Sequence, residues 1–280
     1  MEICKSLQAL AVFRASIRSR GQSLALIPTM GALHEGHLSL IKAAQADGHA
    51  TLTTIFVNPT QFAAHEDLDT YPNTLEADLA ALEGLEVDGL FLPGQELMYP
   101  KGEATRVKVG GPAEGWESAD RSHFFEGVAT VVTKLLSAAQ ADAAYFGEKD
   151  YQQLQVIRRL AADLLIPTEI IGCPTIREAS GLALSSRNMY LSEEQRSQAA
   201  AIFNTLTKAR NALLAQAPIF ETLEQAKQSL LDKGGEAVSY LAYVEAETLR
   251  ALKTHAPEGS GRLLFAGTFA GVRLIDNIAV

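Results

Sequence analysis

The chain has 280 residues, of which 47% are hydrophobic, and this is enough for a substantial core in one large domain or two smaller ones. Its formal net charge of -9 argues against a broad nucleic-acid-binding surface, so any phosphate recognition should be local. Two cysteines without metal-binding or redox spacing, and no apolar run long enough to span a bilayer, indicate a cytoplasmic protein without membrane attachment.

Short apolar runs alternate with helical patterns through the first two thirds of the chain. The predicted strands are 24–27, 52–57, 89–92, 143–146 and 169–172, and the predicted helices include 74–82, 128–136 and 151–164. Strands that alternate with helices are typical of a parallel sheet. The predicted fold class is therefore α/β.

The rhythm changes at the polar segment 175–190. Ser192 and Gln195 then have the spacing of a capping box, which opens a predicted helix over about 193–215. A further helix over 221–233 and strands near 240–245, 262–266 and 272–275 follow, with Gly267, Thr268 and Gly271 expected between the last two strands. We expect one domain over 1–175 and a smaller α+β domain over 176–280.

The segment 28–37 (PTMGALHEGH) lies between a predicted strand and a predicted helix. The first turn of such a helix presents unpaired N–H groups and a positive dipole end, so anionic ligands are favoured there. His34 and His37 share a helical face and could donate hydrogen bonds to a phosphate that gains negative charge. Two alternatives remain: the histidines bind a metal, although no third ligand is obvious nearby, or they form a structural pair.

Polar amides follow the second predicted strand in the segment 56–62 (FVNPTQF). Because ligands bind at the carboxyl ends of parallel strands, Asn58 and Gln61 are candidate substrate-binding residues. A carboxamide both donates and accepts hydrogen bonds, so it could hold a hydroxyl or a carboxylate. The alternative is that these amides satisfy the backbone of their own loop.

Two later segments carry positive charge next to small or hydroxyl residues. In 146–153 (FGEKDYQQ), Lys149 could neutralise a phosphate, and Gln153 could project into the same cleft as Gln61. In 181–188 (GLALSSRN), Arg187 and the two preceding serines could clamp a phosphate. The alternatives are a solvated surface lysine and an interdomain connection or lid.

Three carboxylates could lie near the magnesium ion of a nucleotide, which is usually held by one or two carboxylates and the phosphates. They are Asp78, Glu126 and Asp150. Each is also explained as an ordinary helix-start or surface acid.

Several long motifs occur together and in order. They are PTMGALHEGH at 28–37, FVNPTQF at 56–62, EDLDTYP at 66–72, HFFEGV at 123–128, FGEKDYQQL at 146–154, LSSRNMYLS at 184–192 and RLIDN at 273–277. Over essentially its whole length the chain resembles the pantothenate synthetase family, within the HxGH nucleotidyltransferase superfamily. The resemblance implies a Rossmann-like amino-terminal domain, a smaller carboxy-terminal lid domain and a homodimer.

The resemblance also implies a reaction. ATP activates (R)-pantoate as pantoyl adenylate, with release of pyrophosphate, and β-alanine then displaces AMP to give pantothenate. Magnesium is expected with the nucleotide, and its ligands are not assigned. Two other functions stay open: a nucleotidyltransferase that leaves the nucleotide on its product, and a catalytically silent nucleotide-binding sensor.

Roles follow from the matching motifs. The resemblance implies that His37 is a proton donor, that His34 assists with the phosphates, and that Lys149 and Arg187 complete the catalytic group. The implied ATP-binding residues are Met30, Gly31, Ala32, Leu33, His34, Glu35, Gly36, His37, Gly147, Glu148, Lys149, Asp150, Ile176, Leu184, Ser185, Ser186 and Arg187. Gln61 and Gln153 should hold pantoate, and Gln61 should also meet β-alanine.

The sequence departs from the family pattern at two positions. Asn73 stands where the family often has Arg, which affects any ionic contact made by that loop. Leu184 stands where some relatives have Met, which is an apolar exchange of similar volume.

Overall fold

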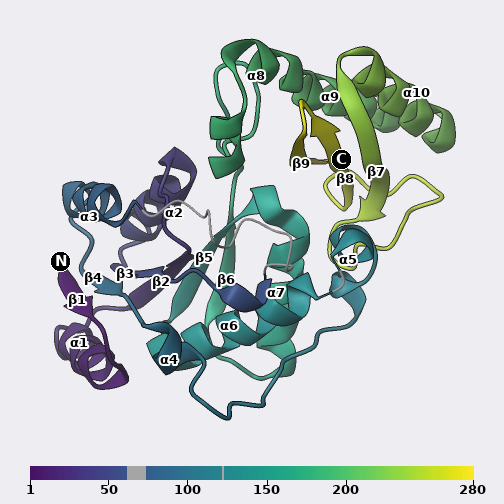
Figure 1. The fold of residues 1–280 in the computed structure, drawn as a ribbon. Helices are drawn as coiled ribbons and strands as arrows, with labels where there is room; N and C mark the ends of the chain where they lie inside the picture. The colour runs from purple at the N-terminus through teal and green to yellow at the C-terminus, as the bar shows by residue number, and fades with distance from the viewer. Residues whose placement is uncertain (62–73, 122) are drawn as a thin grey trace. The chain divides into compact units, whose positions relative to one another are not determined.

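The computed structural model describes residues 1–61, 74–121 and 123–280 of the chain. The chain divides into two units (Figure 1): unit 1 is Met1–Glu148 with Val156–Pro174, and unit 2 is Lys149–Gln155 with Thr175–Val280. The domains expected from the sequence, 1–175 and 176–280, differ from this division in Lys149–Gln155 and in Thr175, which group with the carboxy-terminal residues.

Unit 1 is built on a parallel sheet, which confirms the α/β class. Its strands are β1 (Glu2–Cys4), β2 (Leu24–Thr29), β3 (Ala50–Ile55), β4 (Gly89–Phe91), β5 (Ala143–Gly147) and β6 (Glu169–Cys173), and their order in the sheet is β1-β4-β3-β2-β5-β6. Strands β2 and β3 are almost entirely buried, as expected for strands covered on both faces. The sequence did not predict β1, because a strand of three residues with one buried side chain has no readable pattern.

Helices cover both faces of this sheet (Figure 1). The helices between β1 and β6 along the chain are α1 (Leu7–Ser19), α2 (Glu35–Ala46), α3 (Leu75–Gly84), α4 (Gln95–Met98), α5 (Glu117–Asp120), α6 (Phe124–Ala139) and α7 (Tyr151–Asp163), and α7 begins in unit 2 and ends in unit 1. On one face, Ile41 and Ala44 of α2 and Leu82 of α3 join a core cluster with Ile27 and Tyr145 of the sheet. Helices α1 and α6 pack together on the other face.

The sheet has its topological switch point beside β2. From β2 the chain continues to β3 on one side, and β5 pairs with β2 on the other side through Ala25–Ala143 and Leu26–Ala144. In open α/β sheets the ligand crevice lies outside the carboxyl ends of the strands at this point. The carboxyl ends of β2 and β5 lead directly into the segments 30–37 and 147–148, which the sequence singled out.

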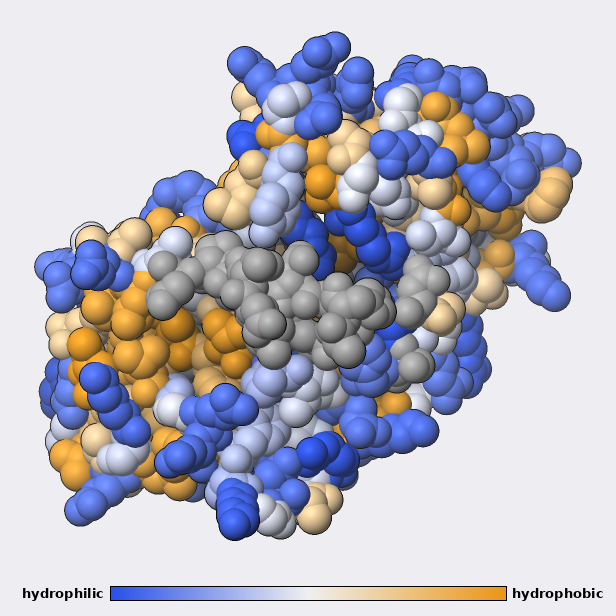
Figure 2. Space-filling view, in the orientation of Figure 1, coloured by the Kyte–Doolittle hydropathy of each residue, from blue (hydrophilic) through white to orange (hydrophobic). Residues whose placement is uncertain are grey.

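Unit 2 carries a small antiparallel sheet and three helices. The strands are β7 (Gly235–Glu245), β8 (Gly261–Phe269) and β9 (Val272–Ala279), in the order β7-β8-β9, and the helices are α8 (Glu193–Ala199), α9 (Ala201–Leu214) and α10 (Ile219–Asp232). Leu206 and Leu213 of α9 and Leu230 of α10 are buried against Phe265 of β8. The outer surface of α9 and α10 is mostly hydrophilic, as Figure 2 shows.

Two local predictions in unit 2 were wrong in detail. The helix expected over 193–215 is interrupted at Ala200, although Ala200 keeps helical dihedral angles. Gly267 and Thr268 lie inside β8, and the turn to β9 is made by Ala270 and Gly271, which both have positive φ as a tight hairpin requires. A side chain at position 267 would meet the backbone oxygen of Ala237 at 2.5 Å, so the glycine serves strand packing.

Both cysteines, Cys4 and Cys173, are buried free thiols in unit 1. Burial is the main cause that raises the pKa of each thiol. Among the described residues, none of the helices has the length and apolar character that crossing a membrane requires.

Candidate functional site

The turn after β2 is held in an uncommon backbone conformation. Gly31 and Ala32 have φ values of +85° and +51°, and such values are unusual for a residue with a side chain such as Ala32. The hydroxyl of Thr29 accepts a hydrogen bond from the N–H of Gly31 (3.2 Å) and donates one to the carbonyl of Thr54 (2.6 Å). The turn is therefore fixed to the neighbouring strand β3.

Helix α2 begins with a capping box formed by the two histidines. The Nδ1 atom of His34 accepts from the N–H of Gly36 (3.1 Å), and the Nδ1 atom of His37 accepts from the N–H of His34 (3.4 Å). The two half-buried rings lie with their centroids 4.2 Å apart. Because each Nδ1 accepts a hydrogen bond, the proton of each neutral ring is on Nε2, which makes Nε2 a donor.

Gly36 has a role that the sequence did not reveal. A Cβ atom at this position would meet the ring of His34 at 2.8 Å. The glycine thus leaves room for the imidazole that caps the helix, whereas the resemblance had implied only that Gly36 binds ATP. Glu35, also expected near ATP, is exposed and forms an ion pair with Lys42 (3.2 Å).

Asp78 of α3 binds the turn that follows β2. Its two carboxylate oxygens accept hydrogen bonds from the N–H groups of Ala32 (3.0 Å) and Leu33 (2.8 Å), and the side chain is buried with 3% exposure. The sequence had offered Asp78 as a possible magnesium ligand. In the structure this carboxylate is occupied by backbone N–H groups.

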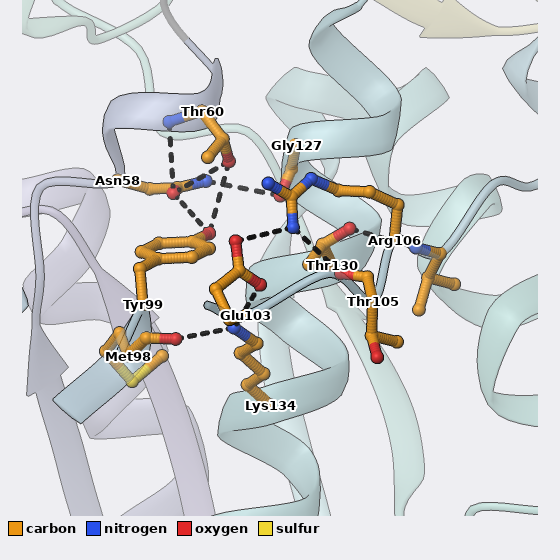
Figure 3. A network of polar contacts seen from close by, with 11 residues as sticks. Asn58, Thr60, Met98, Tyr99, Glu103, Thr105, Arg106, Gly127, Thr130 and Lys134 are labelled. Carbon is orange, nitrogen blue, oxygen red and sulfur yellow. Dashed lines mark hydrogen bonds and ion pairs between the residues drawn. The ribbon is translucent and has the colours of Figure 1, made fainter. Parts of the chain in front are cut away.

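Asn58 is the centre of a polar network beyond β3 (Figure 3). Its Oδ1 accepts from the hydroxyl of Tyr99 (2.6 Å) and from the backbone N–H and hydroxyl of Thr60, and its Nδ2 donates to Gln61 Oε1 (3.2 Å) and to the carbonyl of Gly127 (3.2 Å). Asn58 is only 1% exposed. Its amide is therefore engaged within the protein and orients Gln61. The hydrogen bond from the N–H of Thr60 agrees with the alternative that the amide satisfies the backbone of its own loop.

Gln61 ends the 3₁₀ turn Pro59–Gln61, and its side chain reaches the turn that follows β2. Its Nε2 donates to the sulfur of Met30 (2.7 Å), and its backbone carbonyl accepts from the guanidinium of Arg121 (3.2 Å). The structure thus brings Gln61 and Met30 together within unit 1. The rest of the motifs at 62–73, including the departure at Asn73, lies outside the described residues.

Lys134 and Glu103 surround Tyr99, the residue that donates to Asn58 (Figure 3). The ammonium of Lys134 lies 4.2 Å from the centre of the Tyr99 ring, donates to the carbonyl of Met98 and pairs with Glu103 (3.4 Å). Burial is the main cause that raises the pKa of Tyr99, and the hydrogen bond from Arg106 is the main cause that lowers the pKa of Glu103. Tyr99 therefore stays a neutral hydroxyl donor to Asn58 at ordinary pH. No motif in the sequence marks Tyr99, Glu103 or Lys134, so these residues could not be predicted from it.

Unit 2 gathers the second set of expected phosphate-binding residues. A pocket is lined by residues that include Lys149, Ser185, Arg187, Arg273 and Asp276. The hydroxyl of Ser185 accepts from the N–H of Arg187 (3.3 Å), which shapes the 3₁₀ turn Ser186–Tyr190. Lys149 and Arg187, far apart in sequence, thus line one pocket.

Contacts from β9 hold the Lys149 segment in unit 2. Asn277, which is 3% exposed, donates from Nδ2 to the carbonyl of Lys149 (2.9 Å) and accepts at Oδ1 from Arg262 (2.8 Å). The guanidinium of Arg262 also stacks 3.6 Å from the centre of the Tyr151 ring. These contacts are the physical reason why Lys149–Gln155 groups with unit 2.

The half-buried Arg177 forms an ion pair with Asp276, which is buried and lines the pocket. Arg177 donates two hydrogen bonds to the carboxylate of Asp276 (2.7 and 2.8 Å) and one to the carbonyl of Gly181 (3.1 Å). Arg177 also pairs with Ala183 in a short antiparallel bridge. The RLIDN motif thus includes Asp276 and Asn277, whose roles the sequence alone did not give.

The remaining expected residues differ in their surroundings. Gly147 has no other described atom within 4 Å of the place where a Cβ would stand, so its surface is open. Ile176 is exposed at 36%, and its carbonyl accepts from the N–H of Leu184 (2.9 Å). Glu148, Gln153 and Ser186 are half-buried.

In the part of the chain that the structure describes, no group of three or more His, Cys, Asp or Glu side chains is placed to hold a metal ion. Asp150 is 49% exposed and lies 3.7 Å from the ammonium of Lys149, while Glu126 lies in the first turn of α6.

Comparisons with known proteins give a consistent result. The family described as pantoate-beta-alanine ligase matches residues 2–279. The pantothenate synthetase of Cereibacter sphaeroides is 49% identical over 98% of this chain and 99% of its own length, and that of Granulibacter bethesdensis is 47% identical over 99% and 96%. The crystal structure of the Thermus thermophilus pantothenate synthetase covers the whole chain and 99% of its own, with a TM-score of 0.91 and 43% identity. A Francisella tularensis pantoate-beta-alanine ligase, solved with beta-gamma ATP and beta-alanine, has a TM-score of 0.81 and 36% identity and covers 100% of this chain and 97% of its own.

Proposed function

Because the chain belongs to the pantoate-β-alanine ligase family, we propose that it condenses (R)-pantoate with β-alanine, using ATP and releasing AMP and pyrophosphate. The observation that carries this proposal is the family match over 2–279, together with relatives of nearly equal length. The position of the phosphate-binding motifs at the carboxyl ends of β2 and β5 supports it.

The reaction needs activation because a free carboxylate has no good leaving group. A carboxylate oxygen of pantoate bonds to the α-phosphorus of ATP, and pyrophosphate leaves with the electron pair of the broken P–O bond. The amine of β-alanine then attacks the acyl carbon, AMP leaves, and the nitrogen loses a proton. The protein contributes by aligning reactants and by stabilising charge on phosphorus and pyrophosphate, so no covalent enzyme nucleophile is needed.

We assign the following donors to the ATP phosphates, each described within its own unit. In unit 1 these are the Nε2–H groups of His34 and His37, whose orientation the capping box fixes. In unit 2 they are Lys149, Ser185 and Arg187, which line one pocket. Charge-assisted hydrogen bonds of this kind are stronger than neutral ones, and Arg187 can bind two phosphate oxygens at once.

We assign pantoate to Gln61 and Gln153, and β-alanine also to Gln61. The Oε1 atom of Gln61 is held by Asn58, so the amide has one preferred orientation. Direct contact between Asn58 and a substrate stays a prediction, and the buried position of Asn58 favours a supporting role through Gln61.

Magnesium would enter with the nucleotide and neutralise phosphate charge. Asp150 fits such an ion, because its carboxylate is half-exposed next to the phosphate-binding Lys149. Asp78 fits less well, since both of its oxygens accept backbone hydrogen bonds.

We also propose a homodimer and a cytoplasmic location, both of which rest on family resemblance. Light scattering after size exclusion should give twice the chain mass, and a monomer at assay concentration would contradict the dimer.

The reaction is tested by supplying ATP, magnesium, pantoate and β-alanine to the purified protein. Equal amounts of AMP and pantothenate are expected. With β-alanine omitted, exchange of labelled pyrophosphate into ATP should require pantoate, because the adenylate forms before the amine reacts. Production of ADP, a stable nucleotidylated product, or exchange without pantoate would each contradict the proposal.

A further inference from the structure

We infer that Asp78 is a positioning residue for ATP, because its carboxylate holds the backbone at 31–33 in the conformation that the phosphate site needs. This inference rests on the proposed placement of ATP at the turn that leads into α2. It assigns to Asp78 a function through the backbone rather than through a metal ion.

The contacts of Asp78 leave neither oxygen without a donor. Oδ1 accepts from the N–H of Leu33 (2.8 Å), while Oδ2 accepts from the N–H of Ala32 (3.0 Å) and from the hydroxyl of Thr74 (3.1 Å). With 3% exposure, this carboxylate is screened from water. Hydrogen bonds to a charged, buried acceptor are among the stronger ones in proteins.

The local backbone explains why a charged acceptor is needed here. Gly31 and Ala32 both have positive φ, a conformation that costs free energy for Ala32 because it carries a side chain. Asp78 stabilises this conformation by binding the N–H of Ala32 and that of Leu33. Glycine is favoured at position 31, because its φ of +85° strains any residue with a side chain and a Cβ there would stand 3.1 Å from Oδ2 of Asp78 and 3.3 Å from Ile55.

The consequence for ATP follows from the capping box of His34 and His37, which comes next along the chain. The capping box begins at His34, directly after the backbone that Asp78 holds. If the turn relaxes, only a fraction of molecules presents both imidazoles in the binding geometry, and the apparent affinity for ATP falls by that fraction. Pantoate, proposed to bind Gln61, should be less affected.

Asp78→Asn tests this role with little change in shape. The substitution replaces one accepting oxygen by an NH₂ group that faces a backbone N–H, so one hydrogen bond is lost and one donor is opposed. We expect the KM for ATP to rise about 10-fold. The KM for pantoate and the half-saturating magnesium concentration at saturating ATP should change by no more than about 2-fold, which is the change expected of a substitution that does not affect them.

The matched control is Glu76→Gln, which removes an exposed carboxylate from the first turn of the same helix and should leave every constant unchanged. An unchanged KM for ATP in a folded Asp78→Asn protein overturns the inference. A raised magnesium requirement with unchanged KM for ATP also overturns it, in favour of a metal ligand.

Asp78→Asn could lose its fold, so Thr74→Val provides a second test. It removes only the hydroxyl donor to Oδ2 at an exposed position, and we expect the KM for ATP to rise about 3-fold. If Asp78→Asn does not fold, an unchanged KM in Thr74→Val overturns the inference.

His37→Ala separates this inference from the proposed function. If His37→Ala leaves ATP use intact, ATP binds elsewhere and the site assignment itself fails. If His37→Ala is impaired while Asp78→Asn behaves as the parent protein, only the positioning role of Asp78 fails.

Discussion

At the start of α2, one nitrogen of each histidine serves the helix and the other can serve a ligand. The Nδ1 atoms accept backbone hydrogen bonds, which fixes the neutral tautomer and leaves Nε2 as the donor. The histidines thus have a structural role in capping α2, which was one of the alternatives left open by the sequence, and by our assignment they also bind ATP.

Two substitutions at His37 separate these tasks. In His37→Asn the side-chain oxygen can replace Nδ1 as the cap acceptor, but no donor reaches the place of Nε2. In His37→Gln the side-chain NH₂ can reach that place, and the side-chain oxygen can accept the cap hydrogen bond, as Gln195 does at the start of α8. We expect His37→Asn to lose about 10²–10³ in turnover, as for removal of one transition-state donor, and His37→Gln to lose less.

The measurement is pantoate-dependent pyrophosphate exchange, with thermal unfolding as the check on the cap. A His37→Asn protein that is as active as His37→Gln would show that the donor at Nε2 does not contribute to turnover.

At the scale of elements, the turn Pro59–Gln61 is docked on α6 through Gly127. A Cβ at position 127 would meet the carbonyl oxygen of Thr60 at 2.4 Å and the N–H nitrogen of Gln61 at 2.9 Å. Both are backbone atoms, so they cannot move aside as a flexible side chain could. Gly127 is therefore required by the close approach of two segments.

Gly127→Ala should displace this turn and the amide of Gln61. Alanine gains about 0.5–1 kcal/mol in helix propensity, but overpacking costs about 1–3 kcal/mol, so we expect a net loss of stability. The KM for pantoate should rise more than the KM for ATP. Ser137→Ala, an exposed change on the same helix, is the control, and equal kinetics in both variants would refute the docking argument.

At the scale of the whole chain, the last strand determines the position of a residue 128 positions earlier. Asn277 binds the carbonyl of Lys149 and also accepts from Arg262. Asn277→Asp keeps the acceptor for Arg262 and replaces the donor to Lys149 by an oxygen. An unsatisfied buried carbonyl costs about 1–3 kcal/mol, so we expect turnover to fall about 10-fold.

The control for this change is Asn211→Asp on α9, which introduces the same new charge in unit 2 at an exposed position. Comparable loss in both variants would attribute the effect to charge rather than to the contact with Lys149. Full activity in Asn277→Asp would show that Lys149 does not depend on β9.

The sequence predicted the parallel sheet because its buried strands alternate with amphipathic helices, and this signal is local. It also predicted the capping box of Ser192 and Gln195, whose two hydrogen bonds are present. It could not predict contacts between distant segments, such as Asp78 with 32–33 or Asn277 with Lys149. For Asn58, its position after a predicted strand indicated a polar group at the carboxyl end of that strand, but only the fold showed which atoms its amide binds.

The two thiols lie on opposite edge strands, Cys4 in β1 and Cys173 in β6, and unit 2 has no cysteine. Because both sulfurs are shielded and hold their protons firmly, alkylating reagents can modify them only when an edge of the parallel sheet opens. The natural protein thus carries one thiol at each edge of the parallel sheet, and alkylation of that thiol would report the opening of that edge. Opening of the carboxy-terminal unit would give no such signal.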